Sequence, residues 1–180
     1  MAEIRDATTT DVPAILALHA LVAAEGRWIG TEAPVDTARF AQLFTEGIES
    51  DDSHLFVATD EGRVVGNLGL HPSTPGVTTI GMSIDPAYRG QGIGTALMTA
   101  ALEWARAQPT IHKLVLEVWP HNTAALALYA KVGFAIEGRR PRHYRRRSGE
   151  LWDSIVMGLV LDHTSPGSPY PDHGPGPMTL

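Results

Sequence analysis

The order of predicted elements along the chain indicates a mixed α/β domain, in which a largely antiparallel sheet of about seven strands is flanked by four helices. Three observations predict this class. The chain has 180 residues, which suits a single domain. Apolar residues make up 43% of it and charged residues 19%, so a full hydrophobic core can form. Helix-like and strand-like apolar patterns follow one another, separated by glycine, proline and aspartate turns.

The first half of the chain combines short strands with two helices. Asp11 caps the first helix, with Pro13 in its first turn, where a missing N–H breaks no helical hydrogen bond. The second helix follows from apolar residues at helical spacing, and a turn at residues 60–62 joins two strands. Pro86 stops a third strand. The elements expected here are strands at 4–6, 54–59, 63–70 and 77–84 and helices at 11–24 and 36–48.

The second half alternates helix and strand and ends in a hairpin. Residues 114–116 are all apolar, which is typical of a strand covered on both faces. Asn122 caps the helix that follows, and Gly133 ends it in a left-handed conformation. The elements expected here are helices at 92–107 and 122–132 and strands at 113–119, 134–138 and 151–161.

Composition excludes several classes of protein. The chain has no cysteine, which excludes disulfides, thiolate metal sites and a cysteine nucleophile. Its eight histidines show no tight ligand spacing, so no metal site is expected. Neither an apolar run of membrane-spanning length nor a secretory leader is visible, so we expect a cytoplasmic protein without a membrane partner. Residues 163–180, with five prolines and three glycines, are expected to form a flexible tail beyond a domain at 1–162.

The most informative segment is the glycine-rich turn at residues 85–94, Asp-Pro-Ala-Tyr-Arg-Gly-Gln-Gly-Ile-Gly. A strand ends there and a helix begins, so glycines and free helical amides can cradle a pyrophosphate, with Arg89 as a charged donor at the rim. The spacing Gly90-x-Gly92-x-Gly94 matches neither the dinucleotide fingerprint nor the P-loop. A tight strand-to-helix turn without a ligand is the alternative.

Arg89-x-x-Gly92-x-Gly94 resembles the acyl-CoA pyrophosphate loop of the GNAT superfamily of N-acetyltransferases. A second block is similar in spacing to the ribosomal-protein alanine N-acetyltransferase branch and its small-molecule relatives: Leu116-Glu117-Val118, Asn122-x-x-Ala125, Leu128-Tyr129 and Gly133-Phe134. The resemblance covers nearly all of residues 3–161, including the order of elements. It implies the GNAT fold, acetyl-CoA as co-substrate, and direct transfer to an amine within a ternary complex.

The resemblance also implies which residues bind the cofactor. The strand that ends at residues 82–84 would separate from its neighbour, so that its free backbone groups bind the pantetheine arm and the thioester carbonyl. Backbone amides at residues 91–95 would hold the pyrophosphate, and Asn122 would contact the cofactor arm, unless it is a plain helix cap. The expected cofactor-binding residues are Met82, Ser83, Ile84, Arg89, Gly90, Gln91, Gly92, Ile93, Gly94, Thr95 and Asn122.

Glu117 is the expected general base. It shares a strand face with Val115 and Trp119 that should pack against helices, and a carboxylate buried there is costly unless it is paired or functional. Burial would make the carboxylate more basic, so that it could deprotonate the acceptor ammonium directly or through water. The resemblance implies the same role, because the ribosomal N-acetyltransferase branch has a glutamate at the matching place. The alternative is that Glu117 positions the substrate or pairs with an arginine.

Tyr129 is the expected general acid. It lies seven residues after Asn122, about two helical turns, so the two side chains share one face. The resemblance implies that a tyrosine at this place protonates the leaving CoA thiolate or stabilises it by a hydrogen bond. A core aromatic residue is the alternative.

The acceptor side is less sharply defined. Glu25 and Glu32 flank Trp28 in the joint between the first two helices, an arrangement that can seat a cation, and His71 is a further candidate. The alternative is a set of solvated loop residues around one core tryptophan.

The run from Arg139 to Arg147 holds six of the 14 basic residues and leaves 20 acidic against 8 basic residues elsewhere. It could bind an acidic acceptor, the adenosine phosphate or RNA. We favour a solvated hairpin tip whose arginines pair with Glu137, Glu150 and Asp153, without nucleic acid.

Together these features predict an acetyl-CoA-dependent N-acetyltransferase that acts on a primary amine of a small molecule or peptide. The acidic remainder of the chain favours a cationic amine. Two alternatives stay open: a non-catalytic acyl-CoA-binding regulatory module of the same fold, and a protein N-terminal acetyltransferase. The resemblance admits a homodimer, because this fold often pairs through its later strands.

Overall fold

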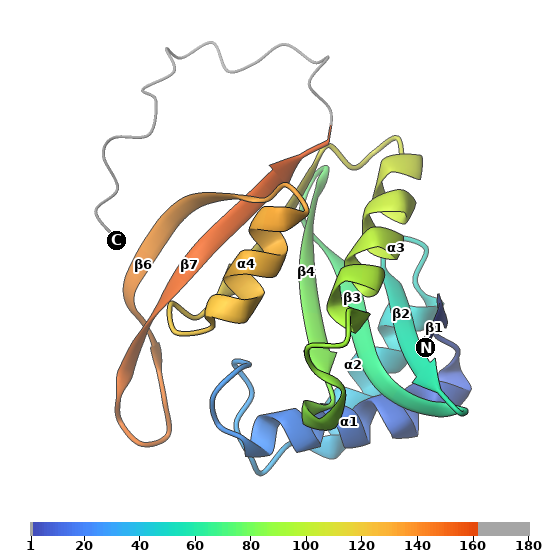
Figure 1. Ribbon diagram of the computed structural model, residues 1–180, viewed down its shortest axis with the longest axis horizontal. Helices are drawn as coiled ribbons and strands as arrows, with labels where there is room; N and C mark the ends of the chain where they lie inside the picture. The colour runs from blue at the N-terminus through green and yellow to red at the C-terminus, as the bar shows by residue number, and fades with distance from the viewer. Residues whose placement is uncertain (1, 162–180) are drawn as a thin grey trace.

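The computed structural model describes residues 2–161 and confirms the predicted mixed α/β architecture, with a seven-stranded sheet in the order β1-β2-β3-β4-β5-β7-β6 (Figure 1). The expected tail at 163–180 lies outside the described residues. The strands are β1 (Glu3–Asp6), β2 (His54–Asp60), β3 (Arg63–Thr74), β4 (Val77–Ile84), β5 (Lys113–Val118), β6 (Ala135–Arg145) and β7 (Leu151–Val160). The helices are α1 (Val12–Ala24), α2 (Thr37–Glu49), α3 (Ile93–Ala107) and α4 (Thr123–Lys131). Within the described part of the chain, no helix is long and apolar enough to cross a membrane.

Two hydrophobic clusters hold the helices against the sheet, one on each face. The larger cluster joins α3 and α4 to the sheet and includes Leu97 and Leu114, both fully buried. The smaller cluster packs α1 on β2 and β3 around Ile15 and Val57. Figure 1 shows α2 behind the sheet and α3 and α4 in front of it. Burial of each such side chain contributes about 1.5–3 kcal/mol, so both layers stabilise the frame around the site.

β4 and β5 form the single parallel pair described in the sheet, and they separate after three residues. Val77–Thr79 pairs with Lys113–Val115, and no pairing continues beyond that point. The rest of β4 stays paired with β3 on its other edge, while β5 stays paired with β7. The last residues of β4 therefore have backbone groups on the β5 side that no strand uses. This is the separation that the resemblance implied.

The terminal hairpin is longer than the sequence predicted. β6 runs to Arg145, not to residue 138, and its register shifts twice, between Ile136 and Gly138 and between Arg140 and Tyr144. Arg142 has a φ of 52° within the second shift. A basic run with a proline does not fit the pattern of a regular strand, but an exposed edge strand accepts both prolines and bulges.

Candidate active site

A cavity of about 680 Å³ opens where β4 and β5 part. Four groups of residues form its wall: the end of β4, the glycine turn before α3, one face of α4, and the loop between α1 and α2 facing β5 and the hairpin. The lining residues are Val22, Trp28, Ile29, Gly30, Ile80, Gly81, Met82, Ser83, Ile84, Arg89, Gly90, Gly92, Gly94, Thr95, Glu117, Val118, Trp119, Asn122, Ala124, Ala125, Leu128, Tyr129 and Tyr144. Nine of the expected cofactor residues belong to this wall; Gln91 and Ile93 do not.

The glycine turn is shaped for close approach of a ligand. Gly90 and Gly92 have φ values of 75° and 84°, in the left-handed region that favours glycine. A Cβ built at either residue meets nothing within 4 Å, so the turn faces open space. At Gly94 a Cβ would lie 3.0 Å from Leu128 and 3.2 Å from Ile84, so this glycine lets α3 pack closely. The first hydrogen bond of α3 runs from Ala96 N to Gly92 O, which leaves the preceding amides free.

α4 presents Asn122 and Tyr129 to the cavity, as their spacing predicted. Asn122 is a helix cap, because its Oδ1 accepts a hydrogen bond of 3.2 Å from Ala125 N, and it also lines the cavity. Tyr129 is 8% exposed, and burial raises the pKa of its hydroxyl to about 12. The phenol therefore keeps its proton at neutral pH and is available as a hydrogen-bond donor.

The expected burial of Glu117 is wrong. Its side chain is 31% exposed, because α1 and α2 cover β2, β3 and β4 and leave the matching face of β5 open. The carboxylate accepts from three donors of the hairpin. Ser154 donates to Oε2 at 2.8 Å, Tyr144 donates to Oε2 at 3.2 Å, and Arg140 forms an ion pair with Oε1. Glu117 is thus a half-exposed carboxylate of fixed orientation at the cavity wall. It pairs with an arginine, which was one of the alternatives to a general base.

The hairpin adds site residues that sequence reasoning missed. Tyr144 lines the cavity, its ring packs edge-on against Trp119 at 4.8 Å, and burial raises the pKa of its hydroxyl, with the Glu117 charge as a second cause. Ser154 is fully buried. The alternation of Trp152 and Ser154 on one face of β7 was a signal for these contacts, but the bulge in β6 hid the partner positions.

Glu25 and Arg89 pair with each other at the rim of the cavity. Arg89 donates two hydrogen bonds to the carboxylate, at 2.5 and 2.9 Å, and a third to Ile84 O at 3.2 Å. Glu25 also accepts from the Trp28 indole at 2.7 Å. Hydrogen bonding by Arg89 lowers the pKa of Glu25 despite its partial burial. The pair ties the glycine turn to the loop after α1, and of these acceptor candidates it is Trp28 that lines the cavity.

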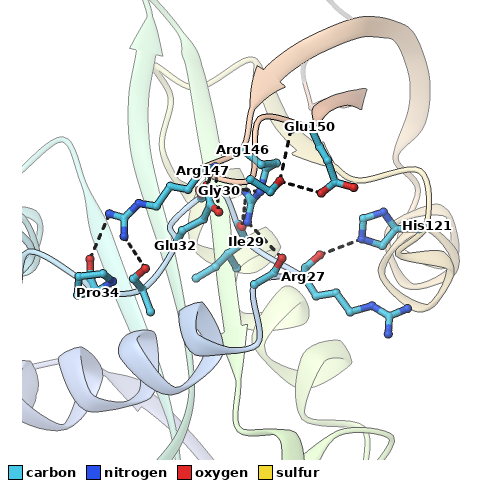
Figure 2. Close-up of polar contacts among 12 residues, drawn as sticks. Arg27, Ile29, Gly30, Glu32, Pro34, His121, Arg146, Arg147 and Glu150 are labelled. Atoms are coloured by element: carbon cyan, nitrogen blue, oxygen red, sulfur yellow. Dashed lines mark hydrogen bonds and ion pairs between the residues drawn. The ribbon is translucent and has the colours of Figure 1, made fainter.

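Arg146 clamps the same loop to the hairpin (Figure 2). It is 4% exposed and donates to the carbonyl oxygens of Gly26, Ile29 and Gly30, each at 3.3 Å. Its guanidinium lies over the Trp152 ring at 4.4 Å. A buried arginine needs this many partners, because an uncompensated charge there is costly.

Arg147 and Glu32 continue the clamp towards α2. The Glu32 carboxylate accepts a hydrogen bond of 3.1 Å from Arg147 N and lies 3.6 Å from Arg146 Nε (Figure 2). The Arg147 side chain donates to the carbonyl oxygens of Ala33 and Pro34. Glu32 therefore holds the loop and does not line the cavity. His71 lies elsewhere, against Gly47 of α2.

The expected pairing of the arginine run with local acids is partly confirmed. Arg139 pairs with Asp153 at 2.5 Å, as expected. Glu137 pairs with Lys113, not with an arginine, and Glu150 meets Arg146 through their backbones. The run is therefore a set of intramolecular contacts more than a solvated tip.

Comparisons with known proteins agree with this geometry. A family model described as the acetyltransferase (GNAT) family matches residues 16–134. The L-methionine sulfoximine/L-methionine sulfone acetyltransferase of Pseudomonas paraeruginosa is 31% identical over 169 residues, 91% of this chain and 96% of that protein. The L-amino acid N-acetyltransferase of Escherichia coli is 30% identical over 162 residues, 87% of this chain and 96% of that protein. The structure of the ribosomal-protein-alanine N-acetyltransferase from Brucella melitensis is 28% identical, with a TM-score of 0.80 over 88% of this chain and 99% of that one.

Proposed function

The chain belongs to the GNAT family of acetyltransferases, and we propose that its cavity between β4 and β5 transfers an acetyl group to the primary amine of a small molecule. It is an acetyl-CoA-dependent N-acetyltransferase, like its named relatives. The observation that carries the residue assignment is the parting of β4 from β5 beside the glycine turn. Because the two strands separate there, one cavity borders the unpaired backbone of β4, the free amides of α3, the buried Tyr129 and the carboxylate of Glu117.

The residues on the cofactor side fit acetyl-CoA. The open space beside Gly90 and Gly92 and the free amides of α3 suit a pyrophosphate, since a helix N-terminus favours anions. The unpaired edge of β4 at residues 82–84 suits the amide-bearing pantetheine arm, which can pair as an added strand does. Asn122 contacts the same arm from α4. Bound acetyl-CoA supplies an activated thioester, and no cysteine of this chain can form an acyl-enzyme, so transfer is direct.

Tyr129 assists departure of the CoA sulfur. A thiol such as that of cysteine has a pKa of about 8.5, several units below the value of about 12 for the Tyr129 hydroxyl. Complete transfer of the phenolic proton to a thiolate is therefore unfavourable. A hydrogen bond from the hydroxyl to the sulfur, which strengthens as charge develops there, is the contribution we assign.

Glu117 holds the acceptor nitrogen and takes its proton. The carboxylate offers about four acceptor positions, and Ser154, Tyr144 and Arg140 occupy three of them. One position on Oε1 remains for the acceptor ammonium. The fixed orientation of the carboxylate serves proximity, and loss of the ammonium proton to Glu117, directly or through water, frees the nitrogen for attack.

The acceptor enters from the side of the loop after α1. Val22 of α1 and Trp28 and Ile29 of the loop line the cavity together with Trp119 and Tyr144, so an acceptor body contacts largely apolar and aromatic surface. The two curated relatives reported above are named for small amino compounds and are 31% and 30% identical over most of the chain, whereas the structure named for a ribosomal protein substrate is 28% identical; this supports a small molecule over a protein terminus.

We also propose a cytoplasmic enzyme that binds no nucleic acid. Four arginines of the hairpin, Arg139, Arg140, Arg146 and Arg147, contact the chain's own carboxylates and carbonyls, which reduces the positive charge that this run offers to a nucleic acid. Cell fractionation and a gel-shift assay with RNA test the two statements; membrane-bound enzyme or a stable RNA complex contradicts them.

The test is a thiol-release assay with acetyl-CoA and a panel of amines, with mass analysis of the products. The panel includes amino acids, polyamines, aminoglycosides and short peptides with free amino termini. We expect acetylated small amines and a loss of about 10²–10⁴-fold in rate for Glu117→Gln that shrinks as pH rises and free amine becomes common. A loss that is constant with pH contradicts the proton-accepting role. Acetylation of peptides alone instead favours a protein N-terminal acetyltransferase.

A further inference from the structure

We propose that the Ser83 hydroxyl is a second anchor for the acceptor nitrogen, across the cavity from Glu117, and that Asn67 is the positioning residue that orients this hydroxyl. The inference rests on the proposed function and adds two side-chain roles to the same site. It starts from a buried polar atom: within residues 2–161, Asn67 Oδ1 has no hydrogen-bond partner. Asn67 is 6% exposed, so water does not replace that partner. Such an atom lowers stability, and proteins keep such costs mainly at functional sites.

Strand alternation places Asn67 and Ser83 on the same face of the sheet. A Cβ built at Gly66 would meet two side chains of α3 at 3.3 Å, so Gly66 faces α3 and Asn67 faces the α1 side. On β4 the Ile84 side chain lies 3.2 Å from a Cβ built at Gly94 of α3, so Ser83 also faces the α1 side. Asn67 and Ser83 are direct partners in the β3–β4 register. Such partners have Cβ atoms about 4.5–5.5 Å apart, within reach of a side-chain hydrogen bond.

Ser83 lines the cavity, and Asn67 lies behind it. A hydroxyl group has one donor and two acceptor positions. When Ser83 donates its hydrogen to Asn67 Oδ1, the hydroxyl oxygen presents only acceptor positions to the cavity. The group that fits there is an N–H donor. Asn67 therefore decides the polarity of Ser83 without touching the acceptor itself, whereas the backbone of Ser83 stays free for the cofactor arm.

Gly81 keeps the space between Ser83 and Glu117 open. Thr79 is the last β4 residue paired with β5, opposite Val115, and continuing this register by two residues brings Gly81 opposite Glu117. A Cβ built at Gly81 meets nothing within 4 Å, so no side chain of β4 stands between the hydroxyl and the carboxylate. An ammonium group has three N–H bonds, of which Glu117 and Ser83 bind one each. Two contacts fix the nitrogen beside the unpaired edge of β4 more closely than one does.

The experiment is a double-variant cycle with Asn67→Leu, Ser83→Ala and the combination of both. Ser83→Thr is the conservative variant, because it keeps the hydroxyl. Thr78→Val is the matched control, because Thr78 is a buried polar residue of the same strand that does not line the cavity. Acceptor kcat/KM is measured with the two amines of the panel that the parent acetylates fastest, starting from L-methionine and spermidine. The KM for acetyl-CoA and the urea midpoint are measured for every variant.

We expect Asn67→Leu and Ser83→Ala each to lower acceptor kcat/KM by about 5- to 30-fold, and by similar factors for both amines, because the contact is to the nitrogen. The double variant should lose no more than the weaker single variant, since both changes remove one contact. Ser83→Thr and Thr78→Val should stay within about threefold of the parent, with the KM for acetyl-CoA nearly constant throughout. Asn67→Leu should keep or raise the urea midpoint, because it removes an unpartnered buried polar group.

Three results overturn the proposal: losses that multiply in the double variant, full activity of Asn67→Leu, or a lowered urea midpoint for that variant. The last of these would mean that Asn67 serves the fold and not the acceptor. In each case an active parent enzyme leaves the proposed function standing. A parent that binds CoA but acetylates no amine contradicts the proposed function itself, and the anchor falls with it.

Discussion

Arg146→Met tests whether one buried arginine holds the acceptor side of the cavity together. The substitution keeps much of the side-chain volume but removes the guanidinium, which donates three hydrogen bonds of 3.3 Å to the loop after α1 and lies 4.4 Å over the Trp152 ring. It also removes the ion-pair partner of Glu32, at 3.6 Å. The affected groups come from both ends of the chain, so the change acts on tertiary structure and not on a single element.

The magnitude follows from these contacts. Hydrogen bonds to a charged group contribute about 1.5–3 kcal/mol each at good geometry, and we take about 1 kcal/mol for each of these long bonds. The cation–π contact adds about 1–2 kcal/mol in a desolvated setting. The total of roughly 4–5 kcal/mol is an upper value, because the freed loop can open and hydrate its carbonyl groups. We therefore expect about 3 kcal/mol, which lowers a urea midpoint by about 1–1.5 M.

Three measurements test the effect of Arg146→Met. Urea unfolding gives the free energy, hydrogen exchange reports protection of amides at residues 26–34, and titration with CoA reports the cofactor side. Arg146→Met should lower protection of the loop and raise the acceptor KM while CoA affinity stays within about threefold. Arg145→Met is the control, because Arg145 is the preceding residue, at the end of β6, and its side chain is exposed. A variant that unfolds within about 0.5 kcal/mol of the parent and keeps loop protection refutes the clamp.

Further predictions concern the cofactor side and pH. Gly92→Ala should weaken CoA binding by about tenfold or more, because it adds left-handed backbone strain and a Cβ that faces the cavity. Gly62→Ala is the control: Gly62 has a φ of 79° in a turn outside the cavity, so the substitution should add strain without changing CoA affinity. Tyr129→Phe should lower kcat by about 10- to 1,000-fold and leave CoA affinity within twofold; an unchanged kcat removes its role. Burial lowers the pKa of His19 and His71 below the ordinary value of about 6.5, so the stability they support is present above that pH and is lost as pH falls through the lowered values. Urea midpoints from pH 8 to 5 should drop accordingly, and an equal drop in the His19→Gln, His71→Gln double variant contradicts this cause.

Local patterns made the frame and the glycine-turn side of the cavity predictable. Helical periodicity and caps located α1 to α4, because apolar spacing and capping residues act within a few residues of chain. The alternate glycines predicted a tight turn before α3 for a similar reason, since Gly90 and Gly92 adopt φ values that other residues rarely accept. The spacing of Asn122 and Tyr129 placed both side chains on one helix face that borders the cavity.

The acceptor side was less predictable because it is assembled from distant segments. Strand alternation put Glu117 on the correct face of β5 but not in the correct environment, because the pattern does not say where α1 and α2 stop covering the sheet. In the same way, the sequence does not distinguish Arg146, which is buried, from Arg145, which is exposed. The difference depends on which residue meets the loop at 26–34.

Two arginines, Arg89 and Arg146, bind the loop after α1 from different elements of the site. Arg89 binds Glu25 at the start of the loop and belongs to the glycine turn, while Arg146 binds the following carbonyl groups and belongs to the hairpin. The loop therefore contacts the glycine turn at one end and the hairpin at the other, with Trp28 between them in the cavity wall. The free amides at the start of α3 belong to the glycine turn and not to the hairpin. Substitutions in the hairpin should consequently change acceptor choice while CoA binding persists, and the separation of these two properties is the physical basis on which one cofactor frame can serve different amines.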